Sequence, residues 1–116
     1  GFPNMFTLVG PQNGSTFCNI PLCIQQNVEW LINLLRYMRD NGIETVEAKR
    51  DAAKAWSEHV SELAAATLFP QATSWFKGDN VPGKARKFLL YAGGFPTFRA
   101  KCDDVAKKGY EGFTLS

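Results

Sequence analysis

Apolar residues recur every three or four positions in three stretches of the chain, and this spacing is typical of amphipathic helices. The first stretch predicts a helix from about 21 to 40 that stops at Gly42. The second predicts a helix from about 49 to 68, and the third predicts a helix around Phe98 that stops at Gly109. The pattern therefore predicts a mostly helical fold with short strands.

The N-terminal stretch differs from the rest because it is continuously apolar from Phe6 to Val9 and is closed by Gly10. This run predicts one buried strand over residues 6–10. Such a strand is usually covered on both faces and paired at its edges, yet the helical stretches that follow offer few strands to pair with it. The sequence favours a chain cut from something larger, and a short strand that closes a helical domain is the alternative.

Two stretches of the chain are candidates for binding a ligand or cofactor. Between Phe69 and Lys87 the helical spacing disappears, and turn residues surround the aromatic pair Trp75 and Phe76. We predict a long loop there, in which Trp75 either stacks on a planar ring and closes over a ligand or holds the loop against the core. The second candidate is the turn-rich stretch 10–21, where the free N–H groups of a helix start favour negative charge.

The composition excludes several classes of function. The 116 residues include 13 basic and 11 acidic side chains, and this balance indicates neither nucleic acid nor anionic lipid as a partner. The three cysteines lack Cys-x-x-Cys spacing, and His59 is the single histidine. We therefore predict no metal site and no disulfide framework. We expect His59 to lie on the surface. No apolar run reaches the ~18 residues of a membrane span. A reducing, cytoplasmic compartment fits best.

Six segments of the chain stand in an order known from one enzyme family. They are GFPNMFTLVGP, NVEW, TLFPQATSWF, GDNVPGK, LLYAGG and GYEGFTL. Together these segments cover nearly all of the chain. In their sequence and order, the protein resembles a C-terminal fragment of a Baeyer-Villiger monooxygenase of the cyclohexanone and phenylacetone type. The family is an α/β flavoprotein with two dinucleotide-binding domains. The resemblance implies that 1–116 is the C-terminal part of the FAD-binding domain, with the loop that closes over NADP at about 70–87.

The resemblance also implies an activity and its participants. In that family NADPH reduces the flavin, and one atom of O2 is then inserted next to a ketone carbonyl to give an ester or lactone. The implied cofactors are FAD and NADPH, and the implied partners are a ketone, O2 and the missing N-terminal part of the same enzyme. By the same resemblance, the cofactor-binding residues are Asn19, Ile20 and Trp75. The residues that would contact the ketone are Phe17, Cys18, Ile20 and Leu90.

Several parts of the family pattern are missing from these residues. They contain no G-x-G-x-x-G motif, no match to the family fingerprint with its His and Trp, and no counterpart of the active-site Arg. We therefore expect no catalytic residue here and no activity from the fragment alone. Two alternatives remain: a related flavin monooxygenase that oxidises sulfur or nitrogen, and a non-catalytic helical interaction module. The module predicts that residues 6–10 are covered by the chain's own core.

Overall fold

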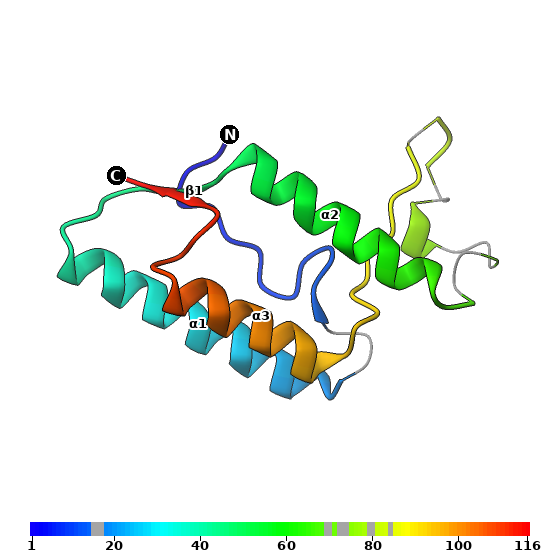
Figure 1. The fold of residues 1–116 in the computed structure, drawn as a ribbon, viewed down its shortest axis with the longest axis horizontal. Helices are drawn as coiled ribbons and strands as arrows, with labels where there is room; N and C mark the ends of the chain where they lie inside the picture. The colour runs from blue at the N-terminus through cyan, green and yellow to red at the C-terminus, as the bar shows by residue number, and fades with distance from the viewer. Residues whose placement is uncertain (15–17, 69–70, 72–74, 79–80, 84) are drawn as a thin grey trace.

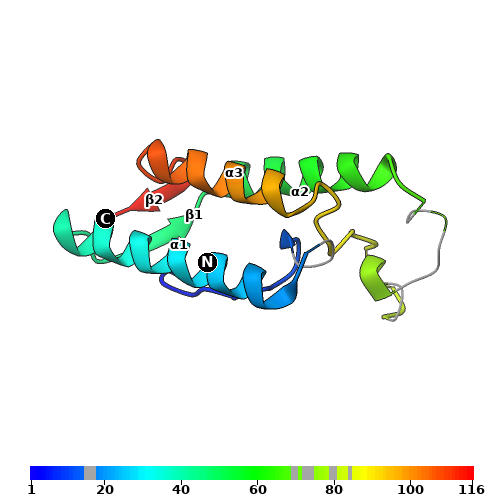
Figure 2. The same cartoon turned by 90° about the horizontal axis from the view of Figure 1, so that it is seen from below.

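The structure is a computed structural model of the chain, and it describes residues 1–14, 18–68, 71, 75–78, 81–83 and 85–116. Its described helices are α1 (Ile20–Asp40), α2 (Arg50–Ala65) and α3 (Phe95–Lys107), and a 3-10 turn, η3, spans Trp75–Lys77. Two short strands, β1 (Val46–Ala48) and β2 (Phe113–Leu115), pair antiparallel. In Figure 1 the N-terminal segment runs between α2 and the pair formed by α1 and α3. Figure 2 shows α2 and α3 in one layer and α1 in the other.

The three predicted helices are confirmed, with small differences at their ends. α1 matches the predicted range, and Gly42 after it adopts the left-handed φ of +64° that ends many helices. α2 ends at Ala65, before the predicted end at 68. α3 begins at Phe95, directly after Gly94 with φ +78°, and stops before Gly109 as predicted. Local spacing and stop residues were sufficient for these elements because helix hydrogen bonds are local.

The predicted strand at 6–10 is wrong for this chain. The segment is irregular, Val9 adopts a φ of +52°, and Phe6 and Leu8 are 36% and 49% exposed. A strand needs a neighbour for its row of N–H and C=O groups, and no described segment pairs with it in this way. The exposed Phe6 and Leu8 also argue against a self-contained interaction module, which would cover them.

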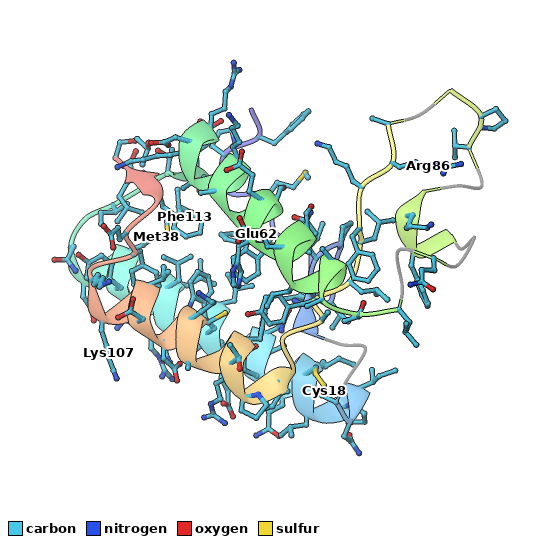
Figure 3. All side chains as sticks on the ribbon, turned by 45° about the vertical axis from the view of Figure 1, so that its right-hand side comes forward. Cys18, Met38, Glu62, Arg86, Lys107 and Phe113 are labelled. Carbon is cyan, nitrogen blue, oxygen red and sulfur yellow. A yellow bond between two sulfur atoms is a disulfide. The ribbon has the colours of Figure 1, made fainter. Side chains whose placement is uncertain are left out.

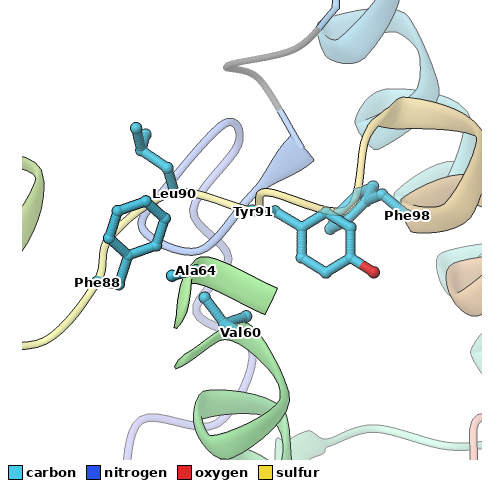
Figure 4. Close-up of a cluster of buried hydrophobic side chains, with 6 residues drawn as sticks. All are labelled: Val60, Ala64, Phe88, Leu90, Tyr91 and Phe98. Atoms are coloured by element: carbon cyan, nitrogen blue, oxygen red, sulfur yellow. The ribbon is translucent and has the colours of Figure 1, made fainter. Parts of the chain in front are cut away.

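Two clusters of buried side chains hold the elements together. The first joins α2, α3 and the extended segment before α3, and Figure 4 shows its members, Val60, Ala64, Phe88, Leu90, Tyr91 and Phe98. Its largest fully buried side chain is Tyr91, stacked on Trp56 with ring centroids 5.3 Å apart. The second cluster joins α1 to β1 and to the turn before β2 through Leu34, Met38, Val46 and Tyr110. Met38 and Phe113, which packs against this cluster, are labelled in Figure 3.

α1 has a second apolar face that the described parts of the chain leave uncovered. Leu34 and Met38 point into the second cluster, whereas five other apolar side chains of α1 are 42–56% exposed. One of them is Leu22, and we call the other four the bare stripe: Ile20, Ile24, Ile32 and Leu35. Their spacing places them on adjoining sides of the helix. Among the described residues, no helix combines the length and the apolarity that a membrane crossing requires.

Candidate cofactor and substrate site

The start of α1 has the features of a site for a negatively charged group. Asn19 caps the helix, because its Oδ1 accepts a hydrogen bond of 3.4 Å from the Leu22 N–H. Pro21 has no N–H, and among the described residues the Ile20 N–H has no acceptor. The first turn contains no acidic side chain, so the positive end of the helix dipole is not offset within α1. Asn19 and Ile20 are exposed, which leaves this helix start accessible.

Cys18 lies directly before this cap and is joined to Cys23 by a disulfide (Figure 3). The sequence analysis predicted no disulfide framework, and this pair corrects that expectation. The two residues stand just before the N-cap and at the end of the first turn, which are the positions that a hydrophobic staple brings together. Cys23 is 1% exposed and Cys18 is half-buried. Phe17, the neighbouring predicted ketone contact, lies outside the described residues.

Leu90 lies in an extended segment that runs beside the loop leading to α1. Leu90 and Asn13 form a single parallel bridge, in which the Tyr91 N–H donates to the Asn13 carbonyl at 3.2 Å. The Leu90 side chain is 8% exposed and packs in the first cluster. The fold thus brings the Leu90 segment to the loop before Asn19, and the contact of Leu90 with a ketone stays a prediction.

Trp75 begins η3, and its side chain lies outside what the structure describes. The turn is attached to the Leu90 segment, because the Phe76 carbonyl accepts a hydrogen bond of 2.7 Å from the Leu89 N–H. η3 is the described helical turn within the predicted loop at 70–87. The segment around Leu89 therefore has the loop before α1 on one edge and η3 on the other.

His59 is not the surface residue that the sequence analysis expected. It is half-buried, and its Nε2 lies 3.1 Å from the Tyr91 hydroxyl. Burial lowers the pKa of His59 below its usual value, the positive charge of Lys101 on α3 lowers it further, and Glu62 on α2 acts in the opposite direction. Helical spacing alone could not reveal this contact, since its partner is 32 positions away along the chain.

The lowered pKa of His59 predicts a loss of stability in mild acid. A folded state that holds the imidazole neutral gains stability from this group above about pH 6.5, the unfolded pKa, and loses it as the pH falls through the lower folded pKa. We expect the Tm of the wild-type chain to fall more between pH 6.5 and 5 than that of a His59→Gln variant, as measured by circular dichroism. An equal fall in both proteins would contradict this assignment.

A cavity of about 460 Å³ lies beside this region, between the N-terminal segment and the helices. Its wall is mainly apolar and includes Trp30, Leu31, Trp56, Phe98, Val105 and Phe113. Cys18, Asn19, Ile20 and Leu90 do not line it, so it is separate from the predicted site. Within the described part of the chain, no group of His, Cys, Asp or Glu side chains could hold a metal ion.

No family model matches the chain, but individual proteins match it from end to end. It is 40% identical to the cyclopentanone 1,2-monooxygenase of Comamonas sp., over 100% of the chain and 21% of that protein. It is 42% identical to a phenazine N-monooxygenase of Lysobacter antibioticus, over 99% of the chain and 21% of that protein. The Baeyer-Villiger monooxygenase of Pseudooceanicola batsensis is 38% identical over 94% of the chain and 20% of its own length.

Solved structures of monooxygenases also match the chain over nearly its whole length. A closed crystal structure of cyclohexanone monooxygenase matches 99% of the chain with a TM-score of 0.90 and 39% identity. An open structure of cyclohexanone monooxygenase matches 99% with a lower TM-score of 0.79 and 33% identity. OTEMO in complex with FAD and NADP matches the whole chain with a TM-score of 0.88 and 40% identity. The chain covers 21%, 19% and 21% of these three proteins, respectively.

The helical segment with its exposed helix start is therefore similar, from end to end, to a part of monooxygenases, one of which was solved in complex with FAD and NADP. Within that class, the chain is homologous from end to end to the Baeyer-Villiger monooxygenases. It spans about a fifth of the length of the curated relatives that it matches. An N-monooxygenase is as similar to it as a ketone monooxygenase, so this segment by itself does not separate the two reactions.

Proposed function

We propose that residues 1–116 form the C-terminal part of the FAD-binding domain of a Baeyer-Villiger monooxygenase that also has an NADP-binding domain. The whole enzyme uses NADPH and O2 to insert one oxygen atom next to a ketone carbonyl, which yields an ester or a lactone. The observation that carries the proposal is the end-to-end match to cyclopentanone and cyclohexanone monooxygenases, at 40% identity and a TM-score of 0.90, respectively. A cytoplasmic location, where NADPH is available, belongs to this proposal.

The start of α1 is suited to the edge of a flavin ring. Bound FAD supplies the redox chemistry with oxygen. In this proposal the Asn19 cap fixes the first turn, and the Ile20 N–H donates to the electron-rich side of the ring, where the helix dipole favours negative charge. The side chains of Phe17, Cys18, Ile20 and Leu90 contact the ketone. They are apolar or nearly so, which suits a cyclic or aryl ketone.

The segment at about 70–87 is proposed to close over NADP, with the Trp75 indole N–H directed to the nicotinamide ribose. The hydrogen bond from Leu89 to Phe76 joins η3 to the proposed wall of the ketone pocket. In this proposal, closure over NADP is therefore linked to the shape of the ketone pocket through the short segment around Leu89.

The remaining part of the same polypeptide is the proposed partner of this chain. The bare stripe of α1 and the N-terminal residues Phe2, Met5 and Leu8 expose large apolar side chains. Contiguous apolar surface of this kind marks an interface. Relatives about five times as long supply the chain length to cover it. We expect no activity from residues 1–116 alone.

Oxidation of nitrogen is the second candidate, and the similarity to the phenazine N-monooxygenase favours it specifically. This chain matches the ketone enzyme and the nitrogen enzyme almost equally, so its residues do not distinguish the two reactions. The two candidates therefore differ in which substrate stimulates NADPH consumption, and in whether the product is an ester or an N-oxide.

Expression of the complete open reading frame that contains this chain tests the proposal. We expect a yellow protein with bound flavin, which consumes NADPH faster when cyclopentanone or cyclohexanone is added and incorporates one atom of labelled O2 into the lactone. A protein that responds to phenazine and not to ketones would establish the second candidate. A protein without flavin, or without a response to either substrate, would refute both. Residues 1–116 expressed alone are the matched control and should be inactive.

A further inference from the structure

Gln12 adopts a backbone conformation that residues with a side chain seldom adopt. Its φ is +62°, in the left-handed region that glycine and asparagine tolerate best. Gln12 lies in the loop that leads from the N-terminal segment towards α1. A strained residue of this kind persists where surrounding contacts hold it, and such residues cluster at functional sites.

Three hydrogen bonds hold Gln12 in place. Its backbone N–H donates to the Leu89 carbonyl at 2.7 Å, and its Nε2 donates to the Phe88 carbonyl at 3.4 Å. Its Oε1 accepts a hydrogen bond of 3.2 Å from the Ser57 hydroxyl on α2. One side chain therefore ties the loop before α1 both to α2 and to the segment that carries Leu90.

The segment bound by Gln12 is held on its other edge as well. The Leu89 N–H donates to the Phe76 carbonyl of η3, and the next bond along the segment runs from the Tyr91 N–H to the Asn13 carbonyl. Leu90 stands between these attachment points. Because the Phe88 and Leu89 carbonyls both bond to Gln12, this residue sets the spacing between the Leu90 backbone and the loop before α1.

We propose that Gln12 is a positioning residue that determines which ketones fit, because it fixes the Leu90 wall of the pocket relative to the flavin-facing start of α1. This inference rests on the proposed function. Gln12 acts through Leu89 and Leu90 and does not itself contact the ketone. Without the Gln12 amide, the segment that carries Leu90 is no longer held at a fixed distance from the start of α1. A large ketone that fills the pocket should then bind more weakly, whereas the binding of a small ketone should change less.

The test uses the full-length enzyme with cyclohexanone as the large ketone and acetone as the small one. For Gln12→Ala we expect the KM for cyclohexanone to rise about tenfold, the size expected for one to two net hydrogen bonds. The KM for acetone should change less than twofold, as should kcat and the flavin content. A structural defect would instead lower the amount of flavin-loaded enzyme and leave both KM values unchanged.

Three further variants separate the contacts of Gln12. Gln12→Glu keeps an acceptor for the Ser57 hydroxyl and removes the donor to the Phe88 carbonyl, so it should behave like Gln12→Ala. Ser57→Ala should raise the KM for cyclohexanone less, because both bonds from Gln12 to the Leu90 segment remain. Ser61→Ala, one turn further along α2 and exposed, is the matched control and should resemble the wild type.

The outcomes distinguish this inference from the function on which it rests. A wild-type enzyme that does not respond to ketones would refute the proposed function and the role of Gln12 with it. An active wild type whose Gln12→Ala variant keeps its KM for cyclohexanone would refute the role of Gln12 alone. So would a variant in which the KM values for cyclohexanone and acetone rise by the same factor.

Discussion

Replacement of Tyr91 by alanine is expected to lower the free energy of unfolding of the chain by about 3–5 kcal/mol, the range found for large aromatic side chains in cores. Tyr91 is 0% exposed, stacks on Trp56 and meets Phe98 edge-on with ring centroids 5.5 Å apart. Its removal leaves a cavity at the point where α2, α3 and the Leu90 segment meet. Urea unfolding followed by tryptophan fluorescence measures the change, since Trp56 lies against the missing ring.

Tyr91→Phe is the matched control, because it keeps the ring and removes only the hydroxyl next to His59. We expect a loss of about 1 kcal/mol, the usual net value of one hydrogen bond. If Tyr91→Ala cost no more than Tyr91→Phe, the first cluster would not be the main stabilising contact between these elements.

Two lysines on the bare stripe are expected to abolish flavin binding by the full-length enzyme while leaving the isolated chain almost unchanged. The double variant Ile24→Lys, Leu35→Lys alters side chains that are 42% and 48% exposed in this chain. Burial of two unpaired charges against the rest of the polypeptide would cost about 4 kcal/mol or more. Flavin absorbance of the purified full-length protein, and circular dichroism of residues 1–116, give the two measurements.

The control for this variant places the same charge elsewhere on α1. Asn33→Lys with Asp40→Asn raises the net charge of α1 by the same two units, at exposed polar positions on the side of the helix opposite Ile24 and Leu35. The full-length control should keep its flavin, because these positions stay in water. Loss of flavin in both double variants would indicate a general effect of charge on α1. Full flavin content in the stripe variant would show that the rest of the enzyme does not cover this face.

The sequence by itself determined the three helices, the ends of α1 and α3, and the resemblance to monooxygenases. The range of α1 followed from the spacing of its apolar residues and from Gly42, because helix formation and termination depend on near neighbours. The candidate site was predicted less completely. Asn19 and Ile20 do lie at an exposed helix start, as their cap position indicated, and their roles with the flavin stay predictions.

Only the tertiary structure decided the features that depend on residues far apart in sequence. The apolar run at 6–10 predicted a buried strand, but a strand requires a partner that the described residues do not contain. Spacing showed that α1 has apolar faces, and contacts with α3, β1 and β2 selected the face that is buried. The His59 contact with Tyr91 and the Gln12 contacts with Ser57 and Phe88 join distant positions. No local pattern encodes such pairs, because chain folding alone brings them together.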